Sequence, residues 1–131
     1  VNGHTYLDGG VADSIPIRKS LADGNTKNVV ILTREEGYQK EPNRAIRLLK
    51  MRYPKSKAFV KKMANRHIRY NDTLAFLEKE EEEGRVFLIR PKEKVNVGRV
   101  EKNRSKLEAL YQIGLEDGRN SIAAMKEYLE R

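Results

Sequence analysis

A run of four apolar residues, Val29 to Leu32, constrains the fold of this 131-residue chain more than any other feature. The run is short and contains two valines, which is typical of a strand that is buried on both faces. It is preceded by Gly3–Leu7, which has the pattern of a short strand, and by a helical segment that begins after Pro16 and ends near Gly24. A strand, a turn, a helix and a second strand in this order predict a βαβ unit with a parallel sheet.

The chain beyond Thr33 changes to a mainly helical pattern. Asn43 is a suitable N-cap for a short helix that Pro54 would end. A longer helix is expected from about Lys55 to Gly84, because one apolar stripe runs along its length. The residues of that stripe are Met63, His67, Tyr70, Leu74 and Leu77. The histidine of the stripe is therefore expected to pack at the edge of the core rather than to act in catalysis.

The C-terminal part of the chain combines strands with a helical pattern. Val86–Ile89 is a strongly apolar strand, and Val95–Val100 is a weaker partner with which it would form a β-hairpin. Ser105–Glu108 has the spacing of a capping box at the start of a helix. Gly114 or Gly118 is expected to break that helix, so that a second helical segment ends the chain.

The positive charge of the chain is concentrated in the segment Lys40–Arg69. The net charge is +8, but this segment alone contains eleven Lys and Arg residues and a single acid, Glu41. Three interpretations stay open: the solvated faces of two helices, a patch that attracts anionic lipid headgroups, and a surface that binds nucleic acid. Nucleic acid is the least favoured partner of the three.

The composition also excludes several kinds of site. The chain has no cysteine, which excludes disulfides, thiolate metal sites and a cysteine nucleophile. His4 and His67 are too few and too far apart to suggest a zinc site. No apolar run approaches the roughly 18–20 residues that a membrane span needs.

Four consecutive glutamates, Glu80–Glu83, end the long helix beside Gly84. Carboxylates at a helix C-terminus oppose the helix dipole, so a stabilising role is not expected for them. Metal binding is the alternative, but adjacent side chains splay around a helix instead of converging on one ion. No metal and no cofactor is therefore expected.

Asp8-Gly9-Gly10 is the most specific short motif of the chain. It directly follows the expected strand Gly3–Leu7, and ligands of parallel α/β sheets bind outside the carboxyl ends of the strands. A carboxylate at that edge, followed by residues without side chains, is accessible to a second catalytic group. It can then take a proton from a hydroxyl nucleophile as a general base. A plain structural turn is the alternative, because Asp and Gly are common in turns.

The wider segment Tyr6–Ile17 resembles the catalytic-aspartate segment of the patatin-like phospholipases. Both have an apolar strand, the Asp-Gly-Gly motif and a proline a few residues later, here Pro16. Many family members have Asn two residues before the proline, where this chain has Ser14. The strand at Val29–Thr33 is similar to the next element of the family. Three later tracts resemble the C-terminal extension of bacterial members, namely 34–38, 65–71 and 84–91.

The resemblance implies a hydrolase of lipid esters that uses a Ser–Asp dyad, with Asp8 as the base. In this family a serine in a Gly-x-Ser-x-Gly elbow attacks the ester carbonyl, and a Gly-rich loop supplies the oxyanion hole. Both parts normally precede the aspartate, and none of the five serines of this chain lies in such an elbow. The chain, which starts at Val1 without an initiator Met, is therefore expected to be a C-terminal fragment that is inactive by itself.

The resulting expectation is an α/β remnant followed by a mainly helical α+β accessory domain. Residues 1–38 would complete a patatin-like three-layer α/β/α domain, and residues 39–131 would form the accessory domain with its small β-hairpin. The expected function is hydrolysis of a lipid or other ester by the parent protein in the cytoplasm, at the periphery of an anionic membrane reached through Lys40–Arg69. The alternative is a basic accessory module that binds an anionic membrane surface or nucleic acid.

Overall fold

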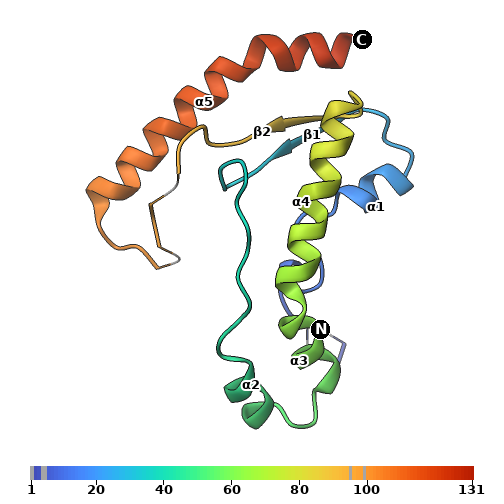
Figure 1. Cartoon of the computed structure of the whole chain (residues 1–131), viewed down its shortest axis with the longest axis vertical. Helices are drawn as coiled ribbons and strands as arrows, with labels where there is room; N and C mark the ends of the chain where they lie inside the picture. The colour runs from blue at the N-terminus through green and yellow to red at the C-terminus, as the bar shows by residue number, and fades with distance from the viewer. Residues whose placement is uncertain (1, 4–5, 95, 99) are drawn as a thin grey trace.

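The computed structural model describes residues 2–3, 6–94, 96–98 and 100–131. In this part of the chain the fold is mainly helical, with a small parallel sheet at its centre (Figure 1). A short 3-10 turn, η1 (Gly9–Val11), leads into helix α1 (Ile17–Ala22) and strand β1 (Asn28–Ile31). Helices α2 (Ile46–Arg52), α3 (Lys57–Ala64) and α4 (Arg66–Glu82) then precede strand β2 (Val86–Ile89) and helix α5 (Arg104–Glu130).

The sheet is parallel, as expected, but it is built from a different pair of strands. β1 pairs with β2, with Asn28 beside Val86 and Ile31 beside Ile89. The predicted hairpin of β2 with Val95–Val100 is therefore wrong: residues 96–98 and 100 form no strand, and positions 95 and 99 lie outside the described residues. The expected strand at Gly3–Leu7 also falls partly outside them, and its last two residues are not in a strand.

The packing of both faces of β2 explains why this strand does not form the predicted hairpin. Successive strand residues point to opposite faces, and both faces of β2 find apolar partners. Val86 and Leu88 are buried in the core with Leu77 of α4, which is completely buried. Phe87 packs against Tyr128 of α5, with ring centroids 5.7 Å apart. The sheet therefore lies between α5 and the layer formed by α1 and α4 (Figure 1).

The core joins the beginning of the chain to its later part. Ile17 of α1 and Leu32, just after β1, are buried in the same cluster as Leu77, Val86 and Leu88. The expected division into residues 1–38 and 39–131 stays a prediction. In this structure the two parts share one sheet and one apolar core.

β1 is less buried than the sequence pattern predicts. Asn28 is buried, but Ile31 is 73% exposed. Among the described residues β1 pairs with β2 alone, so its other edge carries no neighbouring strand. The prediction of burial on both faces is therefore wrong for the end of this strand, because nothing in the described chain covers it.

The apolar stripe that predicts one long helix belongs to two helices. α3 ends and α4 begins at Asn65, which serves as the C-cap of one and the N-cap of the other. The last carbonyls of a helix lack intrahelical partners, and Arg69 of α4 donates to one of them, the Lys62 oxygen, at 2.9 Å. Gly84, with a φ of 71°, follows the end of α4 as expected.

Helix α5 is longer and differently capped than expected. Its N-cap is Asn103, whose side-chain oxygen accepts a hydrogen bond from the Lys106 N–H at 3.2 Å. The helix continues through Gly114 and Gly118, because a glycine costs only about 1 kcal/mol in a helix and Tyr128 anchors the far end to the sheet. No helix among the described residues, α5 included, has the length and apolar character of a membrane span.

The glutamate run at the end of α4 forms ion pairs with both ends of β2. Glu80 is 5% exposed and accepts two hydrogen bonds from Arg85, at 2.6 and 2.7 Å. These bonds hold the pKa of Glu80 below its usual value. Glu81 accepts a hydrogen bond from Arg90 at 2.6 Å. The expectation that these glutamates lack a stabilising role is therefore wrong, because the arginines directly before and after β2 compensate them.

The Tyr128 hydroxyl connects α5 to the starts of both strands. It accepts a hydrogen bond from the Asn28 N–H at 2.9 Å and donates one to the Arg85 carbonyl at 2.7 Å. Tyr128→Phe leaves both backbone groups without this partner, so we expect a loss of about 1–3 kcal/mol in the free energy of unfolding. Urea unfolding measures it, and Tyr111→Phe, at an exposed site of the same helix, is the control. Equal stability of the two variants would contradict this bridging role.

Candidate functional site

Asp8 lies in an exposed loop, residues 8–16, which is called the Asp8 loop below. It is the N-cap of η1, and its Oδ1 accepts a hydrogen bond from the Gly10 N–H at 2.7 Å. A Cβ atom at position 10 would lie 2.8 Å from that oxygen, so glycine is needed there for the carboxylate to approach the backbone. The carboxylate is therefore oriented at one oxygen and remains accessible to solvent.

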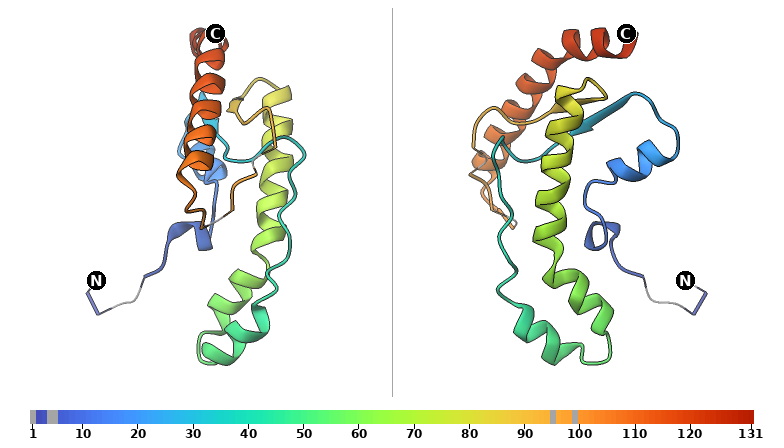
Figure 2. Two further views of the ribbon diagram at one scale, coloured as in Figure 1. Left: turned by 90° about the vertical axis from the view of Figure 1, so that its left-hand side faces the viewer. Right: turned by 45° about the vertical axis from the view of Figure 1, so that its right-hand side comes forward.

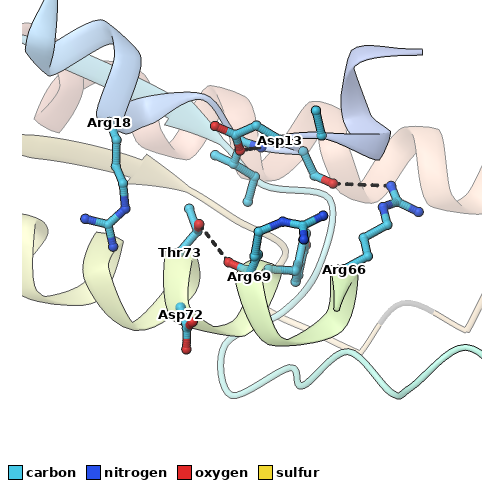
Figure 3. Close-up of a pocket in the computed structure, with 10 residues that line it drawn as sticks. Asp13, Arg18, Arg66, Arg69, Asp72 and Thr73 are labelled. Atoms are coloured by element: carbon cyan, nitrogen blue, oxygen red, sulfur yellow. Dashed lines mark hydrogen bonds between the residues drawn. The ribbon is translucent and has the colours of Figure 1, made fainter. Parts of the chain in front are cut away.

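Two arginines from the start of α4 hold the Asp8 loop. Arg66 donates through Nε to the Gly10 carbonyl at 2.9 Å and through Nη2 to the Ser14 hydroxyl oxygen at 3.2 Å. Arg69 donates through Nη2 to the Val11 carbonyl at 3.2 Å. Figure 3 shows both side chains reaching from α4 toward the loop. Two segments more than fifty residues apart are thus fixed to one another beside Asp8.

A cavity of about 250 Å³ lies between the Asp8 loop, α1 and α4 (Figure 3). Arg18, Arg66 and Arg69 line it, against two acids, Asp13 and Asp72. The excess of positive charge favours an anionic group over a cationic one in this cavity.

Tyr70 lines the cavity beside these arginines, and Phe76 contacts one of them, Arg18. The guanidinium of Arg18 lies 3.8 Å from the ring centroid of Phe76, which fixes its position by a cation–π contact. Burial raises the pKa of Tyr70, and the neighbouring Tyr38 raises it further. The Tyr70 phenol therefore stays protonated at neutral pH and can only donate or accept a hydrogen bond there.

The Asp8 loop contains an accessible carboxylate, but its own serine hydroxyl is not hydrogen-bonded to that carboxylate. Ser14, the serine that follows Asp8 most closely, donates its hydroxyl to the Gly10 carbonyl at 2.9 Å. Its proton is thus engaged by a carbonyl instead of a carboxylate. By itself, Asp8 can accept a proton or a hydrogen bond, but an acyl transfer needs a nucleophile from elsewhere.

Metal binding has no visible basis in the part of the chain that the structure describes. No three His, Cys, Asp or Glu residues there are grouped so that they could hold an ion. The Nδ1 atom of His67 is buried and has no hydrogen-bond partner among the described residues. His67 belongs to α4 and is half-buried, in keeping with its place on the apolar stripe.

Comparison with protein families gives one match. The model of a domain of unknown function, DUF6363, matches residues 56–130. The chain belongs to the DUF6363 family. The DUF6363 region begins just before α3 and ends with α5, so it contributes Arg66 and Arg69 to the site, whereas Asp8 lies outside it. No curated protein and no solved structure matches the chain.

The arginine contacts were not predictable from the sequence. Arg66 and Arg69 are two of eleven basic residues in the segment 40–69, and their spacing is that of any helix face. Asp8 and Gly10 stand out through their motif, whereas the arginines are distinguished only by where α4 places them.

We expect Arg66→Lys to loosen the Asp8 loop. Lysine has no planar fork that can reach the Gly10 carbonyl and the Ser14 hydroxyl together, so amide exchange in residues 9–14 should become about tenfold faster. Hydrogen exchange followed by mass spectrometry measures this change. Arg47→Lys, at an exposed position of α2, is the matched control, and exchange in β1 and β2 should not change. Unaltered exchange in the loop would rule out the positioning role.

Proposed function

We propose that this chain is the C-terminal portion of a patatin-like lipid acyl hydrolase in which Asp8 is the base of a Ser–Asp dyad. The observation that carries the proposal is the Asp8 carboxylate itself. It is exposed, oriented by the Gly10 N–H at 2.7 Å, and so close to position 10 that a Cβ atom there would lie 2.8 Å from its Oδ1. These features fit a carboxylate that acts on a group supplied by another segment, and the segment Tyr6–Ile17 resembles the catalytic-aspartate segment of that family.

Exposed apolar residues directly before Asp8 and at the end of β1 support a missing neighbouring part. Tyr6 and Leu7, directly before it, are 69% and 62% exposed, and Ile31 of β1 is 73% exposed. β1 also has an edge without a partner strand in the described chain, and such edges are normally paired or covered. Further strands of an α/β domain, placed beside β1, would cover both features.

The reaction would follow the general chemistry of a hydroxyl nucleophile. A serine supplied by the preceding segment transfers its proton to Asp8 as its oxygen attacks the ester carbonyl. The alcohol leaves with that proton, and an acyl-serine remains. Asp8 then takes a proton from water as the water oxygen attacks the acyl-serine. Asp8 returns that proton to the serine oxygen as the acyl bond breaks, which releases the carboxylic acid and restores the free serine and the Asp8 carboxylate. Arg66 and Arg69 would keep the loop of Asp8 in place throughout, which gives the DUF6363 region a positioning role.

A fluorophosphonate probe tests this proposal, because it reacts with a serine that is activated by a base. Under this proposal a longer protein, in which a segment with the serine precedes this chain, is expected to be labelled at one serine. The chain of 131 residues is expected to remain unlabelled. Failure of the longer protein to react would contradict the proposed hydrolase. In this account the enzyme acts in the cytoplasm on esters presented at a membrane surface.

A further inference from the structure

The helices α2 and α3 form a protruding end of the molecule that carries exposed apolar side chains. Residues 46–64 are called the tip below, and it lies at the end opposite the C-terminus of α5 (Figures 1 and 2). Leu48 and Met51 are 66% and 79% exposed. They are three residues apart on α2, so they lie on one face of the helix. Large apolar side chains that are exposed together often mark a binding surface.

The same tip is basic and contains no acid. From Pro42 to Asn71 the chain has no Asp or Glu, so the positive charges of the tip are not neutralised from within it. They are Arg47, Lys50, Arg52, Lys55, Lys57, Lys61 and Lys62. A charge near an anionic bilayer contributes about 1 kcal/mol to binding.

A groove between α2 and α3 combines both properties. Its volume is about 520 Å³, and its apolar lining includes Tyr53 and Val60. Its lining also includes three lysines, Lys50, Lys57 and Lys61. An apolar groove lined by three ammonium groups is complementary to a phospholipid, whose phosphate and acyl chain present the opposite charge and the matching apolar surface.

The tip is joined directly to the Asp8 loop. Arg69 donates both to the Val11 carbonyl of that loop, at 3.2 Å, and to the Lys62 carbonyl at the end of α3, at 2.9 Å. The tip and the Asp8 loop are therefore held together through one side chain of α4.

The geometry points to an anionic phospholipid bilayer as the partner of the tip. Leu48 and Met51 would insert among the headgroups from one face of α2. Lys50, Lys57 and Lys61 line the groove on its other face and would contact the phosphates there. A nucleic acid would use the lysines but would leave the apolar pair in water. The inference rests on the proposed function, in which a lipid ester is the substrate. Its test measures membrane binding and not turnover, so the docking surface and the proposed hydrolase function can each be contradicted separately.

Vesicle co-sedimentation at ~150 mM salt, where surface charges are screened beyond about 8 Å, tests the inference. The chain should bind vesicles of phosphatidylcholine with phosphatidylserine and should bind vesicles of phosphatidylcholine alone far more weakly. The double variant Leu48→Gln, Met51→Gln should weaken binding about tenfold or more, and Lys50→Gln, Lys57→Gln, Lys61→Gln about a hundredfold. Both variants change exposed side chains and should keep the circular dichroism spectrum of the wild type.

The matched control is the double variant Lys126→Gln, Leu129→Gln on the exposed face of α5, which should bind like the wild type. Equal binding of the wild type and both tip variants would overturn the inference. So would the absence of vesicle binding together with a duplex-DNA gel shift that the lysine variant abolishes. If vesicles are not bound but the longer protein hydrolyses esters through Asp8, the docking surface is wrong and the proposed function stands.

Discussion

Asp8→Asn is expected to lower ester hydrolysis by the longer protein on the order of 10⁶-fold, as the loss of the general base does in a serine protease. Asparagine has the same shape, and its side-chain oxygen can still accept the Gly10 N–H bond that now measures 2.7 Å. The loop should therefore keep its conformation, and only the capacity to take a proton is lost. Steady-state kinetics with a p-nitrophenyl ester measures kcat and KM, and the loss should appear in kcat.

Asp13→Asn is the matched control for that substitution. Asp13 is an exposed acid of the same loop, and its carboxylate accepts a hydrogen bond from the Ile15 N–H at 3.2 Å, which asparagine also accepts. The change in turnover should stay within about twofold. Comparable losses for the two variants would mean that the loop tolerates no change of charge, and Asp8 would have no special role.

Leu77→Ala should lower the free energy of unfolding by about 2–5 kcal/mol, the usual cost of a cavity in a rigid core. Leu77 has no exposed surface, and its cluster brings together Ile17 of α1 and Val86 of β2. Urea unfolding of the 131-residue chain measures the change, with Leu48→Ala, at a 66% exposed position, as the control. If Leu77→Ala loses no more unfolding free energy than Leu48→Ala, the core around Leu77 does not hold the two parts of the chain together.

Local sequence patterns predicted the elements whose causes are themselves local. Helix α1 begins after Pro16, α4 ends before Gly84, and the apolar runs at 29–32 and 86–89 supply most of β1 and all of β2. In each case the determining residues lie within the element or directly beside it. Proline fixes a helix start, glycine a positive φ, and a short run of branched residues a strand.

Partners far apart in the sequence could not be assigned in the same way. β2 was expected to pair with the nearest weak strand in the sequence. It pairs instead with β1, from which three helices separate it along the chain. This pairing allows Val86 and Leu88 to be buried against α4 and Phe87 against α5. The division of one apolar stripe at Asn65 likewise depends on Arg69, which contacts both α3 and the Asp8 loop.

The candidate site likewise contains some residues that the local sequence predicts and others that only the tertiary structure reveals. Asp8 was identified from its motif, and Gly10 has a steric reason to be glycine that only the structure supplies. The arginines that hold the loop come from the DUF6363 region and carry no motif of their own. Their role arises from the position of α4 beside the loop, which is a consequence of the tertiary fold.

The most direct test of the central claim is p-nitrophenyl ester hydrolysis by two proteins, the 131-residue chain and the longer protein that supplies the segment before it. We predict turnover by the longer protein, loss of that turnover with Asp8→Asn, and no turnover by the 131-residue chain. A longer protein that fails to hydrolyse any ester, or that hydrolyses esters equally well without the Asp8 carboxylate, would contradict the assignment of Asp8 as the base of a lipid acyl hydrolase.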